Sequence, residues 1–411
     1  MNKPERFLLL PTLFVAAAWL VASALVASEA VVGATLRVPQ DYPTIQAAIN
    51  AARDGDLVLV SPGVYHENLT LSGKTITLAS LFHTTSDETY IGQTILDGRG
   101  QTVVGVGASV GPETRIVGFT IQNGEDGIAA SGKLHVLNNH ITGNVDGVDF
   151  SSSGGFVRDN VFENNRDDGV DVDGATGVVV ENNLIRDNDD DGVEVRLHEY
   201  SGPTLHIVIR GNTISGNGED GLQLIDYPDL SPRVFRIERN LITNNAMVGL
   251  GLMDEGVTKE DFRAASLPER IYLFHNTFVG NPHGVTGGGN LIAVNNLFVG
   301  SADLALKNVD AGSIAAYNLF WDNGVNYQSS NVNINTTLFA DPLLDSHYRP
   351  RAGSPAIDAG AARFEWNGET VLDFPPGAYS GLAPDLGQYE SNPVPAPPAP
   401  PRRRPPPPRR R

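Results

Sequence analysis

A short asparagine-rich phrase recurs along the middle of the chain and constrains its fold more than any other feature. It reads Asn-x-Ile/Phe, in most copies with a second asparagine three residues after the apolar one. Successive copies start 21, 23, 29, 28, 36, 20 and 22 residues apart. A unit near this length is too short for a pair of helices and suits one coil of a parallel β-helix. The copies start at Asn139, Asn160, Asn183, Asn212, Asn240, Asn276, Asn296 and Asn318.

Such a coil lays its strands in parallel on the next coil, with a spacing of ~4.8 Å between them. We therefore expect the Ile and Phe positions to point inward as apolar stacks. We expect the asparagines to stack at a turn, where each amide bonds to the next. The LxxLxLxxN spacing of the rival leucine-rich solenoid is missing. The predicted fold class is an all-β parallel β-helix solenoid.

A second phrase, built around Asp-Gly, is written four times in the same region, at 144–150, 166–172, 189–195 and 218–224. When the copies are aligned on the glycine, their acidic residues form two columns. The column before the glycine holds Asp146, Asp168, Asp191 and Asp220. The column two places after the glycine holds Asp149, Asp171, Glu194 and Gln223.

The two columns predict different roles. Asp-Gly is typical of turns, because glycine adopts positive φ and aspartate hydrogen-bonds its own backbone. This structural role would explain the first column without any function. In Gly-Val-Asp-Val the valines face inward, so Asp149, Asp171 and Glu194 should face outward. Carboxylates stacked one rung apart repel by about 1 kcal/mol in water and about 3–4 kcal/mol near a protein surface. A cation, an arginine or a raised pKa should offset this repulsion.

Hard oxygen ligands of this kind bind Ca²⁺. Asp168, Asp171, Asp191 and Glu194 could surround an ion that bridges to an acidic polysaccharide, and Asp146 and Asp220 extend the candidate metal column. Arg196 lies two residues after Glu194 on the same face, and His198 opens the first long loop. The candidate catalytic residues are Asp149, Asp171, Glu194, Arg196 and His198.

The net charge of −19 narrows the choice of partners. Such a surface repels nucleic acid and anionic membranes, so we expect a glycan partner and no nucleic acid. The chain has no cysteine and therefore no disulfide or thiolate metal site. Lys3 and Arg6 precede an uncharged run, which predicts a signal peptide over 1–34. The run is also long enough to span a bilayer, so an uncleaved anchor is the alternative, and either would export the rest of the chain. We expect an exported monomer, secreted or held at the cell surface or periplasm, with no membrane span after signal cleavage.

The segment from Leu36 to Thr77 predicts an N-terminal cap. Ile45, Ala48, Ile49 and Ala52 are spaced as one face of a short helix, and alternating strands follow it. This stretch resembles the opening of secreted right-handed parallel β-helix proteins of the pectin-lyase-like superfamily. The resemblance implies a right-handed helix with a capping helix at its start.

The resemblance also implies chemistry. Pectate-lyase-like members use Ca²⁺ and an Arg or Lys that takes the proton α to a uronate. Asn144-Val-Asp146 and Asp167-Asp168 resemble two polygalacturonase motifs, which makes glycoside hydrolysis an alternative, although that family's Gly-His-Gly and Arg-Ile-Lys motifs are missing. His198-Glu199 resembles a fragment of the alginate epimerase motif Asp-Pro-His-Glu. A third alternative is a non-catalytic, adhesin-like surface protein.

Three insertions, Leu197–Thr204, Asp226–Arg233 and Met253–Glu269, follow the acidic strands and should form one wall of a groove. The segment 341–391 resembles the closing segment of β-helix proteins of the choice-of-anchor Q type, and the Pro/Arg-rich tail 392–411 is expected to be disordered. The expected domains are a cap with the first coils (35–100), the β-helix (101–340), the closing segment and the tail.

Overall fold

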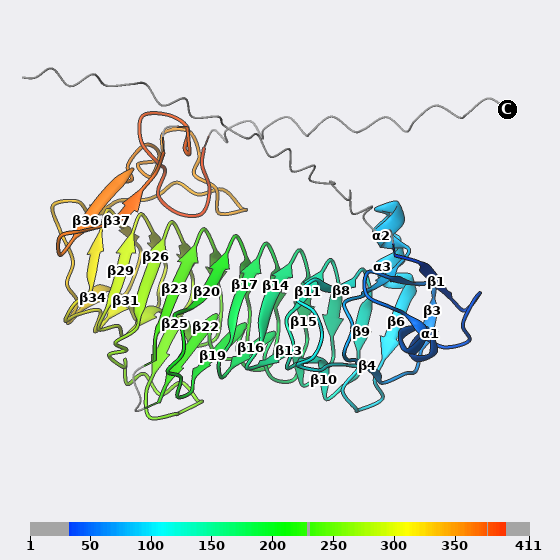
Figure 1. Ribbon diagram of the computed structural model, residues 1–411. Helices are drawn as coiled ribbons and strands as arrows, with labels where there is room; N and C mark the ends of the chain where they lie inside the picture. Colours follow the sequence, from blue (N-terminus) through cyan, green and yellow to red (C-terminus); the bar gives the residue numbers. More distant parts are fainter. Residues whose placement is uncertain (1–32, 228–230, 376, 392–411) are drawn as a thin grey trace, which may run out of the picture. The chain divides into compact units, whose positions relative to one another are not determined.

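The computed structural model describes residues 33–227, 231–375 and 377–391. Three long parallel sheets, which we call A, B and C, dominate the described part (Figure 1). From Leu69 to Trp321 each coil contributes one strand to sheet C, then one to sheet A, then one to sheet B. The all-β parallel β-helix predicted from the asparagine repeat is confirmed.

The strands of each sheet pair in coil order. Sheet A contains β1 (Thr35–Val38), β2 (Leu57–Val60), β5 (Thr77–Ser80), β8 (Thr114–Val117), β11 (Leu134–Leu137), β14 (Gly154–Arg158), β17 (Gly177–Glu181), β20 (Leu205–Arg210), β23 (Arg233–Glu238), β26 (Arg270–Phe274), β29 (Leu291–Val294) and β32 (Ile314–Ala316).

Sheets B and C complete the coil. Sheet B contains β3 (Gly63–Tyr65), β6 (Thr94–Asp97), β9 (Thr120–Gln122), β12 (His140–Thr142), β15 (Val161–Glu163), β18 (Leu184–Arg186), β21 (Thr213–Ser215), β24 (Leu241–Thr243), β27 (Thr277–Val279), β30 (Leu297–Val299), β33 (Leu319–Trp321) and β35 (Leu338–Phe339). Sheet C contains β4 (Leu69–Leu71), β7 (Val104–Val106), β10 (Asp126–Ala130), β13 (Asp146–Ser151), β16 (Val170–Asp173), β19 (Val193–Leu197), β22 (Leu222–Asp226), β25 (Val248–Met253), β28 (His283–Thr286), β31 (Leu304–Lys307) and β34 (Val325–Gln328).

The core consists of stacked apolar side chains from all three sheets. Phe278, Phe298 and Phe320 occupy successive rungs of sheet B, with ring centroids 5.0 and 5.1 Å apart. Val170 and Val193 pair in register on sheet C and are fully buried. The inward apolar stacks expected at the Ile and Phe positions are therefore present.

The repeated asparagines form a buried ladder at the turn between sheets A and B. Asn183 illustrates the pattern: its Nδ2 donates to Oδ1 of Asn212 at 3.0 Å, while its own Oδ1 accepts from Nδ2 of Asn160 at 3.0 Å. A second ladder, which includes Asn165 and Asn188, follows sheet B. These bonds satisfy polar groups at the turns and hold neighbouring coils in one register.

The N-terminal end is covered by α1 (Ile45–Ala51), which buries Ile45, Ala48 and Ile49 as its spacing predicted. Thr44 caps this helix by accepting from the backbone N–H of Ala47 at 3.1 Å. Two short helices, α2 (Phe82–Thr85) and α3 (Thr89–Gln93), lie between β5 and β6. None of the helices within the described residues is long and apolar enough to cross a membrane.

The closing segment contains the antiparallel hairpin of β36 (Arg363–Trp366) and β37 (Glu369–Asp373), which lies beside the last coils (Figure 1). Leu372 packs with Phe274 and Ile292 of sheet A. His275 is buried beneath the segment, and its Nδ1 lies 3.1 Å from the carbonyl oxygen of Asp385. Burial lowers the pKa of His275 to about 3, so this histidine is uncharged and serves to pack the closing segment against the coils.

The predicted signal peptide, apart from 33–34, and the predicted tail lie outside the described residues.

Candidate functional site

The aspartates before each glycine form a ladder that caps the backbone of the following coil. Asp168 Oδ1 accepts from the N–H of Asp191 at 2.9 Å, and Asp191 Oδ1 accepts from the N–H of Asp220 at 2.7 Å. Asp146 and Asp220 continue the ladder at either end, through Asp168 N at 3.2 Å and Val248 N at 2.8 Å. Each of these aspartates therefore commits one oxygen to the backbone of the next coil, 22 to 29 residues later in the chain, and not to its own turn.

The glycines that follow these aspartates do not have positive φ, so the expected turn chemistry of Asp-Gly is wrong. Glycine is needed because the coils approach closely: a Cβ at Gly169 would lie 2.7 Å from the carbonyl oxygen of Gly192.

The second column lies in register on the outward face of sheet C. Asp149 pairs with Asp171, Asp171 with Glu194, and Glu194 with Gln223. Asp171 and Glu194 are nevertheless only 6% and 3% exposed, while Asp149 is half-buried. The side chains leave the coil as the alternation predicts, but neighbouring side chains and loops cover them.

Arg196 supplies the counter-charge that the repulsion argument required. Its guanidinium lies 3.0 Å from Oδ2 of Asp171 and 3.6 Å from Oδ2 of Asp173, and it also pairs with Glu194. Burial works against its charge, but these carboxylates raise the pKa of Arg196 above its ordinary value. The guanidinium therefore keeps its proton, which disfavours the role of proton acceptor that the family resemblance implied for it.

One guanidinium cannot neutralise all of these acids. Burial raises the pKa of Asp171 to about 9 and that of Glu194 to about 8, while Arg196 opposes both shifts. Oδ1 of Asp171 is buried and has no hydrogen-bond partner among the residues that the structure describes. The same holds for Oδ2 of Asp191. Such oxygens need a proton or a cation.

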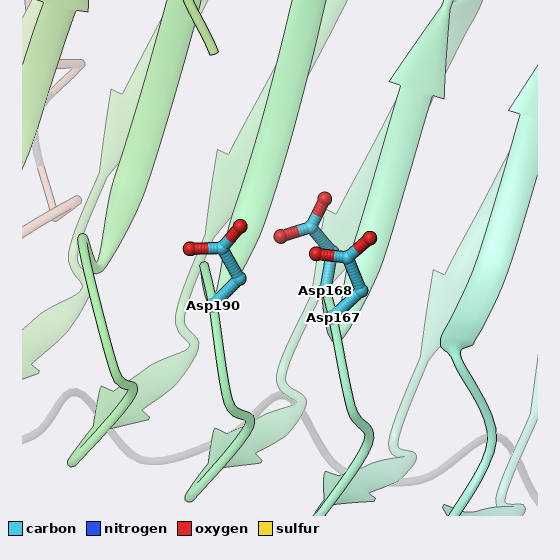
Figure 2. Close-up of side chains that lie close together, drawn as sticks. All are labelled: Asp167, Asp168 and Asp190. Atoms are coloured by element: carbon cyan, nitrogen blue, oxygen red, sulfur yellow. The ribbon is translucent and has the colours of Figure 1, made fainter. Parts of the chain in front are cut away.

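Two groups of carboxylates are close enough to share an ion, and Asp168 belongs to both. Asp168, Asp171 and Glu194 form the buried group, with their oxygens within 4.8 Å of one another. Asp167, Asp168 and Asp190 form the second, shallower group, where the turns before β16 and β19 bring their carboxylates to one side (Figure 2). Among the described residues, the candidate ligands Asp146, Asp191 and Asp220 fall outside both groups.

The three insertions leave the same corner, between sheets C and A, as expected. The ring of His198 stacks on Tyr227 with centroids 4.4 Å apart, and its Nε2 lies 3.5 Å from Oδ1 of Asp173. Arg233 donates to the carbonyl oxygen of His198 at 3.0 Å and thereby joins the second insertion to the first. His198 is thus held at the edge of the acidic column, beside Arg196.

The longest insertion brings two residues to the site that the sequence analysis missed. Glu260 is buried with its carboxyl hydrogen-bonded to that of Asp220. A Cβ at Gly251 would lie 2.0 Å from Oδ2 of Asp220 and 2.5 Å from Oε2 of Glu260, so the acid pair fills the space beside this glycine. Lys259 reaches Oε1 of Glu219 at 3.4 Å. The feature of the sequence that could have indicated these two residues is the charged run Lys-Glu-Asp at 259–261, inside the longest insertion.

Comparisons with known proteins agree with this architecture. Residues 102–263 match the family described as "Right handed beta helix region". Pectate lyase Pel9A superposes with a TM-score of 0.57 at 19% identity, over 84% of this chain and 90% of that chain. The mannuronan C-5 epimerase AlgE6 A-module of Azotobacter vinelandii gives a TM-score of 0.47 at 18% identity, over 72% of this chain and 94% of that chain. No curated protein matches the chain. At these identities the likeness establishes the right-handed parallel β-helix fold and nothing further.

Proposed function

We propose that the protein acts on an acidic polysaccharide laid along sheet C, with a divalent cation held in the acidic column. The observation that carries this proposal is the buried group of Asp168, Asp171 and Glu194, which has too many carboxylates for its one guanidinium. The unpartnered Oδ1 of Asp171 supports it. The pectate lyase among the similar structures supports the same class of substrate by analogy of fold.

The donor set fits Ca²⁺, because carboxylate oxygens are its preferred ligands. Calcium takes six to eight oxygens, so three carboxylates would leave positions for the carboxylates of a uronan. A bound cation would supply charge neutralisation at the uronate, which acidifies the neighbouring C–H. The residues that would hold it are Asp168, Asp171 and Glu194, with Asp167 and Asp190 as the shallower alternative.

The remaining groups suit β-elimination. Arg196 is a permanent positive charge beside the column and would bind the uronate carboxylate. His198 is 43% exposed and contacts Asp173, so its imidazole can accept the proton α to that carboxylate. Asp149, half-buried on the same face, would bind sugar hydroxyls. His198 therefore takes the role of base. It removes the proton on C5 of the uronate, the electrons of that C–H bond form the C4–C5 double bond, and the glycosidic C4–O bond breaks, with a water molecule protonating the leaving oxygen.

Two other functions fit part of the site. Hydrolysis would use a carboxylate pair, but Asp146 and Asp168 are tied to the backbone ladder, which leaves them poorly placed as acid and nucleophile. A non-catalytic surface protein would use the column only as a structural spine, and the Asp ladder favours this second candidate. Export through the segment 1–34, and electrostatic attachment of the Pro/Arg-rich tail to an anionic envelope or to the acidic body, remain part of the proposal.

The experiment is a screen on pectate, alginate and other uronans, with Ca²⁺ or with EDTA, that follows the absorbance of unsaturated products and the appearance of reducing ends. Elimination predicts unsaturated products that depend on the cation and are lost in Asp171→Asn and His198→Ala. Reducing ends without unsaturation would assign hydrolysis. Binding without either product would assign the non-catalytic role, and no binding and no product on any uronan would overturn the proposal.

A further inference from the structure

A groove crosses the outward face of sheet A, away from the acidic column on sheet C. It consists of two adjoining hollows, with volumes of about 690 and 300 Å³, that share Pro112, Lys133 and Gly177. The larger hollow lies over the short turns that connect sheets C and A in the early coils, and Tyr200 of the first long loop lines it. The smaller hollow continues onto β11, β14, β17 and β20. We call the combined feature the sheet A groove.

The floor of the sheet A groove is apolar and aromatic. Phe156 and Val179 are neighbours in register on β14 and β17, and both point away from the core. The ring of His135 lies against Phe156 with centroids 4.9 Å apart and an interplanar angle of 51°. A half-buried aromatic ring beside aliphatic side chains is a surface on which the C–H face of a sugar ring packs.

Gly177 lines both hollows, and a comparison with its neighbour Gly154, which lines neither, shows why a glycine matters there. Gly154 and Gly177 are partners in register on β14 and β17. Gly154 has φ of 138°, and a Cβ there would lie 2.1 Å from the carbonyl oxygen of Gly177, so the backbone requires glycine. At Gly177 the nearest atom to an added Cβ is the His206 carbonyl oxygen at 3.4 Å, an ordinary contact. The backbone does not demand a glycine at 177, but any larger residue would fill the hollow.

Lys133 lines both hollows of the groove, and His206 lines the smaller one. Lys133 precedes β11 and His206 lies on β20, three strands further along the sheet, and both side chains are exposed. Three rung spacings place them ~14 Å apart along the sheet. Within the residues that the structure describes, neither forms an ion pair. Glu113 also lines the smaller hollow, but its charge is paired with Arg115 at 2.9 Å, so Lys133 is the charge of the groove that is left without a partner. In a chain of net charge −19, this surface favours an anionic ligand.

We propose that the sheet A groove binds an acidic oligosaccharide, separately from the chemistry on sheet C. The sugar rings pack on Phe156 and Val179 over Gly177. A uronate carboxylate pairs with Lys133, and an imidazole N–H of His206 donates a hydrogen bond to the sugar. A site of this kind would hold the protein on a polyanionic glycan while another stretch of polymer occupies sheet C. The assignment depends on the shape and charge of the groove and does not require turnover or a cation.

The test is calorimetric titration of the full-length protein with trigalacturonate and with triguluronate, in EDTA, so that a cation-dependent site on sheet C is silent. We expect wild-type protein to bind at least one of them and Gly177→Leu and Lys133→Ala to bind it at least tenfold more weakly. Maltotriose, which is neutral, should not bind. Asp168→Asn, which changes the acidic column, should bind as the wild type does. The melting temperature of Gly177→Leu reports whether the variant is folded.

Arg210→Ala is the matched control, because it removes one positive charge from sheet A outside the groove, where Arg210 pairs with Glu181 at 3.0 Å. It should retain wild-type affinity. The inference is overturned if neither acidic sugar binds in EDTA, if folded Gly177→Leu binds as tightly as wild type, or if maltotriose binds equally well. Loss of all uronan turnover with intact binding in EDTA would instead overturn only the function proposed for sheet C.

Discussion

The guanidinium of Arg196 reaches back one coil to lie 3.0 Å from Oδ2 of Asp171, a residue 25 positions earlier in the chain. This contact ties β19 to β16 on the outward face of sheet C. Arg196 also contacts Glu194 and Asp173. One positive charge is therefore shared among three carboxyl groups, and the column keeps an excess of acid. Most properties that we expect of the site follow from this imbalance between one cation and several buried carboxyls.

Replacing Arg196 with glutamine should destabilise the protein. Removing one partner of a fully buried ion pair costs about 3–5 kcal/mol, and because the Arg196 side chain is 24% exposed we expect about 2–3 kcal/mol at pH 8. Urea denaturation followed by circular dichroism measures this change. The surface control Arg37→Gln, whose pair with Asp41 is 3.9 Å long and exposed, should cost less than about 1 kcal/mol. Equal losses in the two variants would contradict the importance of the Arg196 contact.

Stability should fall as pH rises when no divalent cation is present. The folded protein raises the pKa of Asp146 and Asp190 to about 7, of Glu194 to about 8 and of Asp171 to about 9, in each case chiefly through burial. An acid with a raised folded-state pKa holds its proton in the folded state. Its stabilising contribution is complete below its unfolded pKa of about 4 and is lost as pH rises through the folded value.

Urea denaturation in EDTA at pH 5, 7 and 9 tests this dependence. The free energy of unfolding should decrease across the series, and Asp171→Asn should flatten the decrease, because the amide cannot ionise. Stability that rises between pH 5 and pH 9 would contradict the assignment of protonated carboxyls to the column.

Calcium should reverse the loss at high pH, because a bound cation replaces the missing protons. We expect Ca²⁺ to raise the melting temperature of the wild type at pH 8 and not that of Asp168→Asn, since Asp168 belongs to both carboxylate groups. Asp220→Asn is the matched control: Asp220 occupies the same ladder but neither group, so this variant should keep the response. A calcium response that survives in Asp168→Asn would refute the cation site.

The asparagine ladder should contribute measurably to stability at each rung. Asn183→Ala removes the Nδ2 bonds to Val157 O at 2.9 Å and Asn212 Oδ1 at 3.0 Å, and leaves the amide of Asn160 without its acceptor. Because these groups are buried, we expect a loss of about 2–4 kcal/mol. The exposed Asn335→Ala should change stability by less than about 0.5 kcal/mol. Chemical denaturation of both variants measures the free energy of unfolding. If Asn183→Ala left this free energy unchanged, the ladder would not stabilise the fold.

The sequence by itself determined the coil and its register. The spacing of Asn160 and Asn183 predicts one coil, and aligning the Asp-Gly phrases correctly stacks Asp171 on Glu194, because a solenoid repeats its side-chain positions with its backbone. The inward valines and the helix that begins at Ile45 follow from the same periodic logic.

Only the tertiary structure decided how the columns are covered and what they contact. Asp171 is buried because Arg196 returns one coil, and Glu260 meets Asp220 because a long loop folds back over Gly251. The path of a long loop is not periodic, and neither are the contacts that a side chain makes with another coil, so no repeat encodes them. The hollow at Gly177 has the same origin: whether a glycine serves the backbone or leaves space depends on which atoms from other coils surround it.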